Sequence, residues 1–206
     1  MYCDGSRRDP QLTPAAEQFF FFGGTFDPPH TGHQKIVRHI LQTAPGARVI
    51  VMPAASAPLR SDERLFSYRE RFHLLRRAFA QEVAAGSVAI SVLERRLPAP
   101  NYTVNTLTAL AGFCAQKPIV VIGGDQAEKL PRWHRAEELF AQYEFLVFAR
   151  GGATPNIPGL RARYVPDFAE DISATERRAL LAAMPAASRL KAAVAAVDPT
   201  GDQPAK

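Results

Sequence analysis

Residues 22–33 read FGGTFDPPHTGH, and the whole string is more specific than any of its parts. It follows an apolar run at Gln18–Phe22, which predicts a strand, and it opens a helical pattern at Thr31–Thr43. Gly23 and Gly24 are expected to let the backbone turn sharply and approach a ligand closely. The first amides of a helix lack partners and its dipole favours negative charge. The stretch therefore predicts a phosphate-binding loop between a strand and a helix.

Two histidines, His30 and His33, stand three residues apart at this helix start. That spacing puts them on one face of the first turn, directed at the same ligand. Imidazoles there can donate to phosphate oxygens, and phosphates would favour their charged form. Neither G-x-x-x-x-G-K-[ST] nor G-x-G-x-x-G is present, which excludes a Walker loop and a dinucleotide fingerprint. No third Cys, His or Glu has the spacing of a zinc ligand, so no protein-bound metal is expected.

Strand and helix patterns alternate along the rest of the chain, which predicts an α/β fold. Further strands are expected at Arg48–Met52, Val88–Leu93, Ile119–Ile122, Phe145–Ala149 and Ala162–Val165. Further helices are expected at Tyr68–Ala85, Val104–Ala115, Arg135–Ala141, Ala174–Ala183 and Ala186–Val197. The prediction is a Rossmann-like, doubly wound, mostly parallel sheet with a small C-terminal helical part. In such a sheet the ligand lies beyond the carboxyl ends of the strands.

Domain boundaries follow from composition. Residues 1–17 are polar and predict a flexible leader, residues 18–197 predict a single domain, and residues 198–206 predict a flexible tail. The C-terminal helical part of this domain covers about 171–197. Two helix starts carry an S-x-x-E capping box, Ser67 with Glu70 and Ser173 with Glu176.

The overall composition bounds the partners and the compartment. A net charge of +5 suits a phosphate-rich ligand. The sequence has no dense run of Lys and Arg interleaved with aromatic residues, so nucleic acid is not expected as a partner. Cys3 and Cys114 have no metal-like spacing and are expected to be free thiols. No apolar run is long enough to span a membrane, and no signal peptide pattern opens the chain. A cytoplasmic protein without a membrane partner is expected. The oligomeric state stays open, a homo-oligomer included.

The string GGTFDPPHTGH resembles the phosphate-binding signature of the nucleotidylyltransferases that carry the HxGH motif. Among these the sequence is most similar to the bacterial nicotinate-nucleotide adenylyltransferases, over roughly residues 19–183. The resemblance implies that His30 and His33 are catalytic. It also implies that the loop residues bind ATP, namely Gly23, Gly24, Thr25 and Phe26.

Three later segments carry the same resemblance. Tyr102 and Thr103 match the Y-T-x-x-T-L segment, in which the threonine helps to hold a nicotinate carboxylate, and Thr103 is also expected to cap the helix that follows. Gly123 and Asp125 follow a strand, where the family aspartate contacts bound nucleotide. Trp133 matches L-P-x-W and would stack on the pyridine ring.

Other positions match the family only in part. His134, assigned here to the substrate site, stands where many relatives carry another aromatic residue. Leu59 replaces a common histidine in the loop after the second strand, although Arg60 keeps the cation. Each segment taken alone also fits a turn, a cap or a core tryptophan.

Residues 171–178, DISATERR, resemble the family motif I-S-x-T-x-x-R. Ile172 and Ser173 would contribute to ATP binding at a helix start. Arg178 would neutralise the β- and γ-phosphates and steady the leaving pyrophosphate. Arg177 departs from the pattern, in which isoleucine is usual.

The resemblance implies adenylyl transfer: the 5′-phosphate of nicotinate mononucleotide attacks the α-phosphorus of ATP, giving nicotinate adenine dinucleotide and pyrophosphate in NAD biosynthesis. Mg²⁺ would enter with ATP and be held mainly by phosphates. Alternatives remain. The same transfer on nicotinamide mononucleotide or phosphopantetheine fits the motifs, and so does a nucleotide-binding regulator without catalysis. An aminoacyl-tRNA synthetase is disfavoured because no K-M-S-K-S string is present.

Overall fold

A parallel sheet forms the centre of the computed structural model, which describes residues 2–3, 18–56, 64–114, 116–149, 157–166, 168 and 174–197. The strand order is β1-β4-β3-β2-β5-β6-β7, and every neighbouring pair runs parallel. The strands are β1 (Tyr2–Cys3), β2 (Phe19–Gly24), β3 (Arg48–Pro53), β4 (Val88–Ser91), β5 (Ile119–Gly123), β6 (Phe145–Phe148) and β7 (Ala162–Val165). The predicted α/β class is confirmed.

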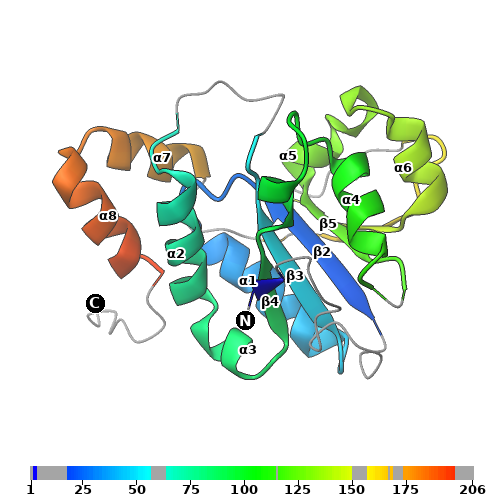
Figure 1. Ribbon diagram of the computed structural model, residues 1–206, viewed down its shortest axis with the longest axis horizontal. Coiled ribbons are helices and arrows are strands. Elements are labelled where there is room, and N and C mark those ends of the chain that lie inside the picture. The colour runs from blue at the N-terminus through cyan, green and yellow to red at the C-terminus, as the bar shows by residue number, and fades with distance from the viewer. Residues whose placement is uncertain are drawn as a thin grey trace.

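Helices cover both faces of the sheet (Figure 1). They are α1 (Thr31–Thr43), α2 (Tyr68–Ala78), α3 (Ala80–Ala84), α4 (Thr103–Ala111), α5 (Gly124–Ala127), α6 (Ala136–Gln142), α7 (Ala174–Ala182) and α8 (Ala186–Ala195). α1 and α2 pack on one face and α4 and α6 on the other, while α7 and α8 lie outside α2.

The run of four phenylalanines in β2 shows why this strand is central. Phe20 and Phe22 pack with α1 and α2, whereas Phe19 and Phe21 pack with α4 and α6. Successive side chains of a strand point to opposite faces, so a strand covered on both sides needs a continuous apolar run.

The strand order places the ligand site. From β2 the chain winds outward through β3 and β4, then returns to the other side of β2 to form β5. Ligands of open α/β sheets bind beyond the carboxyl ends of the strands at this point of reversal. The loops after β2 and β5 meet there.

One predicted helix, Tyr68–Ala85, is wrong in its continuity: it is divided at Phe79 into α2 and α3. The buried side-chain amide of Gln34 donates to the carbonyl of Ala78, with Nε2 and O 2.9 Å apart. Phe79 is fully buried and leaves the helical region with φ −119°. Core packing and a hydrogen bond from α1 therefore end α2, which sequence periodicity cannot register. Its N-terminus is as predicted, with the Ser67–Glu70 capping box formed.

Other boundaries differ from the expectation. β4 ends at Ser91, and Leu93–Arg96 form a 3₁₀ turn, η2. α4 begins at Thr103 and ends at Ala111, four residues short of the predicted end. Tyr2–Cys3 of the expected leader form β1, while the rest of the leader and the tail 198–206 lie outside the described residues.

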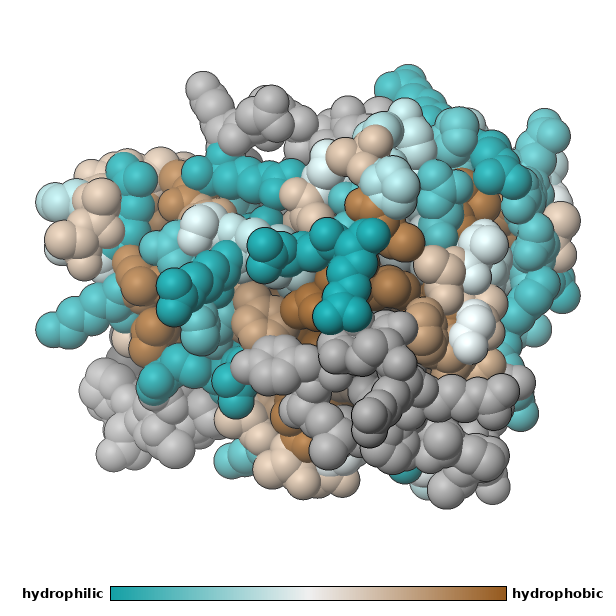
Figure 2. Space-filling view, viewed as in Figure 1, coloured by the Kyte–Doolittle hydropathy of each residue, from teal (hydrophilic) through white to brown (hydrophobic). Residues whose placement is uncertain are grey.

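Hydrophilic and hydrophobic residues are mixed on the visible surface, with hydrophobic residues gathered near the middle of this face (Figure 2). The exposed large apolar side chains are those of Leu180, Met184 and Leu190, on α7 and α8 or between them. Within the part of the chain that is described, no helix has the length and apolarity needed to cross a bilayer.

Candidate active site

A cavity of ≈ 680 Å³ opens at the carboxyl ends of β2 and β5, where the strand order predicts the ligand. Thirteen of the fifteen residues assigned to the site from sequence line it: Gly23, Gly24, Thr25, Phe26, His30, His33, Tyr102, Thr103, Gly123, Asp125, Trp133, His134 and Arg178. The other two, Ile172 and Ser173, lie outside the described residues, as do Leu59 and Arg60. Residues up to 155 positions apart thus line one cavity.

The two histidines sit at the start of α1, with His30 as its N-cap residue. Their ring centroids are 3.7 Å apart. The backbone N–H of His30 donates to Nδ1 of His33 at 3.1 Å. An imidazole that accepts at Nδ1 carries its proton on Nε2. The local backbone therefore favours a neutral His33 that donates through Nε2, where the sequence suggested that phosphate would favour the charged form.

Gly23 and Gly24 are the last two residues of β2 rather than a sharp turn, which corrects the expected role of these glycines. Neither has a positive φ. A Cβ on Gly23 would lie 2.8 Å from the ring of Phe21, and one on Gly24 would lie 3.2 Å from the ring of Phe26. A larger residue at either position would crowd these aromatic rings, which fill the space beside the strand end.

Phe26 makes the actual turn, with φ 49° in the left-handed region. A bulky residue there carries strain of order 1 kcal/mol, so surrounding contacts must compensate. Its ring is buried and packs at 4.8 Å from the ring of His33 and 5.4 Å from that of Phe22, between centroids. The turn thus supports one face of the His33 imidazole.

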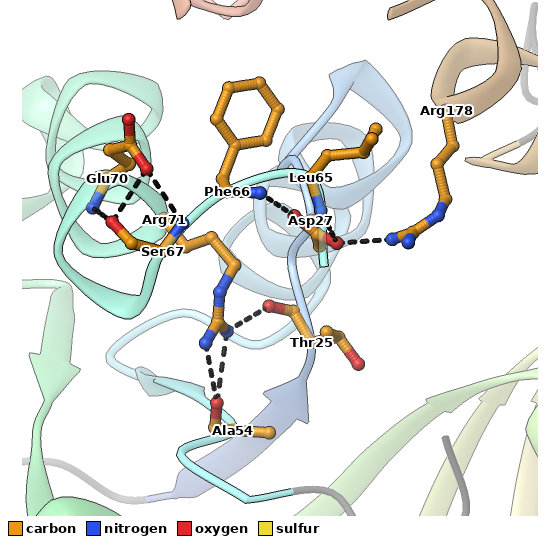
Figure 3. A network of polar contacts seen from close by, with 9 residues as sticks. All are labelled: Thr25, Asp27, Ala54, Leu65, Phe66, Ser67, Glu70, Arg71 and Arg178. Carbon is orange, nitrogen blue, oxygen red and sulfur yellow. Dashed lines mark hydrogen bonds and ion pairs between the residues drawn. The ribbon is translucent and has the colours of Figure 1, made fainter. Parts of the chain in front are cut away.

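Arg178 enters the cavity from α7 and forms an ion pair with Asp27, in the loop between β2 and α1 (Figure 3). The Asp27 side chain is fully buried, whereas that of Arg178 is 31% exposed. Asp27 also accepts hydrogen bonds from the backbone N–H groups of Leu65 and Phe66. Sequence reasoning missed Asp27, although it stands in the FGGTFDPPHTGH string, three residues before His30.

Arg71 of α2 is a second residue that the sequence analysis missed. It is fully buried and donates to the carbonyls of Thr25 at 2.6 Å and Ala54 at 3.1 Å (Figure 3). Burial lowers the pKa of Arg71, and the nearby Arg64 acts in the same direction. Arg71 joins the loops that follow β2 and β3. The available signal was a charged residue on the apolar stripe of a helix, beside Leu74 and Leu75.

Glu94 continues this connection toward α4. Its carboxylate accepts from the backbone N–H of Ala55 and from Oγ1 of Thr106, both at 3.0 Å. Asn101 makes a similar connection: its side chain accepts from the N–H of Ser56 and donates to the carbonyl of Glu94. Glu94 lines the cavity and is buried. The loop after β3 is therefore bonded to the helix on the opposite side of the site.

Burial is the main cause that raises the pKa of Glu94, against the opposing effect of its hydrogen bonds from Ala55 and Thr106. A carboxyl whose pKa is higher in the folded state contributes stability that is present at low pH and lost as pH rises through that folded pKa. The side chain of the Glu94→Gln variant cannot lose a proton. The melting temperature of the variant minus that of the parent should therefore increase from about pH 4 to about pH 8, by roughly 2–4 °C for each kcal/mol of stability that the parent loses. Thermal unfolding across this range measures it, and a difference that is constant or falls with pH would contradict it.

The opposite wall of the cavity is built around the start of α4. Tyr102, not Thr103, is the N-cap residue, and no side chain caps the helix, which corrects the expected cap. Thr103 is the first helical residue. The ring of Tyr102 stacks on that of exposed His134, with centroids 4.1 Å apart and planes at 27°. Half-buried Trp133 lies next to this pair on the cavity wall. A helix start and three flat rings can bind a planar ring bearing an anion.

Asp125 lies in the first turn of α5, beyond the end of β5. It is exposed at the cavity and accepts from Nε2 of Gln126 at 2.7 Å. Its Oδ1 fills the space that a Cβ on Gly123 would need, at 2.8 Å. This glycine therefore leaves room for the carboxylate at the strand end.

The chain matches the family model described as cytidylyltransferase-like over residues 21–180. It is 33% identical over 178 residues to a probable nicotinate-nucleotide adenylyltransferase of Gloeobacter violaceus, covering 81% of this chain and 85% of that protein. It is 32% identical over 161 residues to one from Bacillus mycoides, covering 76% and 82% of the two chains.

Solved structures show the same fold at low identity. The nicotinic acid mononucleotide adenylyltransferase of Plasmodium falciparum, complexed with NaAD, has a TM-score of 0.64 at 15% identity, over 85% of this chain and 89% of that chain. A putative nicotinate-nucleotide adenylyltransferase from Vibrio parahaemolyticus has a TM-score of 0.54 at 19% identity, over 86% and 98%.

Proposed function

Because the chain belongs to the cytidylyltransferase-like family, and within it to the nicotinate-nucleotide adenylyltransferases, we propose that its cavity joins ATP to nicotinate mononucleotide. The chain is a nucleotidyltransferase of NAD biosynthesis, and its products are nicotinate adenine dinucleotide and pyrophosphate. One observation carries the assignment to this cavity: the histidines of α1, Arg178 of α7 and the start of α4 line it together.

The reaction needs no nucleophile from the protein. An oxygen of the mononucleotide 5′-phosphate forms a bond to the α-phosphorus, the bond from that phosphorus to the β-phosphate oxygen breaks, and pyrophosphate leaves. Catalysis rests on positioning and on neutralising charge in line with the attack. Nε2–H of His33 and the neighbouring His30 are suited to charge at the α-phosphate, because their rings stand at the helix start.

Arg178 is suited to the other end of the triphosphate. It is a guanidinium on the cavity wall, and its planar array of donors matches phosphate oxygens. Positive charge there steadies the leaving pyrophosphate. Thr25 and the end of β2 precede the histidines in sequence and line the same cavity, where they would hold the phosphates.

The mononucleotide belongs to the wall around Tyr102, Thr103 and Trp133. The N-terminus of α4 has no side-chain cap, so its amides and the Thr103 hydroxyl suit a carboxylate. This favours the acid form, nicotinate, over the neutral amide. The indole of Trp133 supplies a face for the pyridine ring.

Mg²⁺ fits this site as a companion of the triphosphate. Among the described residues no group of three or more His, Cys, Asp or Glu side chains could hold a metal ion. Asp125 offers one exposed carboxylate at the cavity. When bound, the cation would neutralise phosphate charge, with the phosphates as its principal ligands.

A substrate panel tests the function. Pyrophosphate release is measured with ATP and Mg²⁺ against nicotinate mononucleotide, nicotinamide mononucleotide and phosphopantetheine. We expect the highest kcat/KM with nicotinate mononucleotide. A preference for the amide or for phosphopantetheine would overturn the substrate assignment, and ATP binding without pyrophosphate release from any substrate would indicate a regulator.

Trp133→Ala should raise the KM for nicotinate mononucleotide, because the stacking face for the ring is lost. Loss of a base–aromatic stack costs roughly 1–3 kcal/mol, so an increase of about 5- to 150-fold is expected. Trp133→Phe should keep most of the affinity. Initial rates at saturating ATP measure the effect, and an equal rise in the KM for ATP would show that Trp133 does not serve the mononucleotide side.

A further inference from the structure

Asp27 joins its own loop to two other segments of the chain (Figure 3). Its Oδ1 accepts from the N–H of Phe66 at 2.8 Å, and its Oδ2 accepts from the N–H of Leu65 at 3.0 Å. The same Oδ2 pairs with Nη1 of Arg178. The carboxylate thus links its own loop to the segment before α2 and to α7, which is 151 residues further along the chain.

Burial makes this carboxylate dependent on its partners. The side chain has no exposed surface, and a buried charge without partners is costly. Two backbone amides would satisfy the carboxylate from one side, as at many loop anchors. The third partner is different, because Arg178 is 31% exposed and lines the cavity. The link therefore reaches from a buried anchor to a residue that faces the substrate.

The bond also places Arg178 relative to the histidines. Asp27 lies between Phe26, which supports the His33 ring, and His30, which begins α1. A guanidinium has five N–H donors in a fixed plane, so a bond to one carboxylate oxygen orients the group without using all its donors. α7 packs against α8, and the pair with Asp27 links Arg178 to the loop that follows the central strand β2.

We propose that Asp27 is a positioning residue that holds Arg178 at the triphosphate end of the cavity. This inference rests on the proposed function, because it assigns Arg178 to ATP. Asp27 does not touch the substrate in this account. It acts through Arg178, and its loss should therefore weaken the binding of ATP and spare the mononucleotide.

A double-mutant cycle tests the proposal. Asp27→Asn, Arg178→Ala and the double variant are compared with the parent by calorimetric binding of α,β-methylene-ATP and, separately, of nicotinate mononucleotide. We expect Asp27→Asn to weaken binding of the ATP analogue by roughly 10-fold or more, since small misplacements of a positioning group have effects of this size. Binding of the mononucleotide should change by less than about 3-fold. The double variant should bind the analogue no more weakly than Arg178→Ala, because coupled residues are not additive.

A surface ion pair supplies the matched control. Arg38 and Glu82 form an exposed pair at 3.2 Å that is not part of the cavity wall, so Glu82→Gln should leave both affinities unchanged. If Asp27→Asn gives no folded protein, Asp27→Glu retains the charge but displaces it and should show the same selective loss.

Three results would overturn the proposal: additive losses in the double variant, equal weakening of both ligands, or a normal ATP affinity in Asp27→Asn. The proposed function fails differently, when the parent protein itself binds no ATP analogue or releases no pyrophosphate.

Discussion

Replacing His33 by Ala is expected to lower kcat by roughly 10²- to 10³-fold, the usual effect of removing one donor to developing charge. In the proposed mechanism His33 is expected to donate through Nε2, because its Nδ1 accepts from the backbone N–H of His30. The fold should survive, since the helix start keeps its backbone bonds and the ring is only half-buried. Pyrophosphate release at saturating substrates gives kcat, and thermal unfolding reports the fold.

If the proton of neutral His33 is on Nε2, the Gln and Asn variants at this position should differ in activity. Gln places its side-chain N–H₂ near the position of Nε2, whereas Asn places it near Nδ1. His33→Gln should therefore retain more activity than His33→Asn. His73 is exposed on α2 and away from the cavity, so His73→Ala is the control and should keep parental activity. Near-normal turnover in His33→Ala would refute its role, and a better Asn variant would refute the tautomer.

Arg178→Ala is expected to lower kcat/KM for ATP by roughly 10³-fold, because an arginine that stabilises transition-state charge in phosphoryl transfer contributes 10³ or more. Arg178→Lys retains the charge but not the planar array of donors, so an intermediate loss is expected. Initial rates over a range of ATP at saturating mononucleotide measure both variants. Arg38→Ala removes an exposed arginine of α1 and is the control.

Stability must be separated from chemistry in this experiment, because Arg178→Ala leaves Asp27 with only its two backbone donors. We expect a lower melting temperature in Arg178→Ala and recovery of part of it when Asp27→Asn is added. Activity should not recover with it. An Arg178→Ala variant that retains the parental kcat/KM, or activity that returns together with stability, would contradict a direct role at the phosphates.

The relation between sequence and structure differs from one part of the site to the next. The strand–loop–helix unit of β2 and α1 was predictable because its signal is local: an apolar run, two glycines and a helix start follow one another directly in residues 18–43. The start of α1 at Thr31 and its end at Thr43 are as predicted. β7 also has its predicted bounds, Ala162–Val165. Local periodicity determines such elements with little help from the rest of the chain.

For some residues of the site, the sequence predicted that the residue matters but not the structural reason. Gly23 and Gly24 were assigned to the site for backbone freedom, and the structure shows that a Cβ at either position would crowd the rings of Phe21 and Phe26. Thr103 was expected to cap α4, but Tyr102 occupies that position. In both cases the sequence indicates that a small or polar residue matters. The cause is seen only in the packing around that residue in the folded structure.

Local sequence patterns were enough to predict the α/β class and the strand–loop–helix unit of β2 and α1, because these depend on neighbours along the chain. Tertiary structure decided how α2 ends at Phe79, which glycine contacts matter and what Asp27, Arg71 and Glu94 bind. These outcomes depend on groups that lie far apart in sequence and meet only after the strands assemble. A buried charge takes whatever partner the fold brings to it, and no local pattern records that partner.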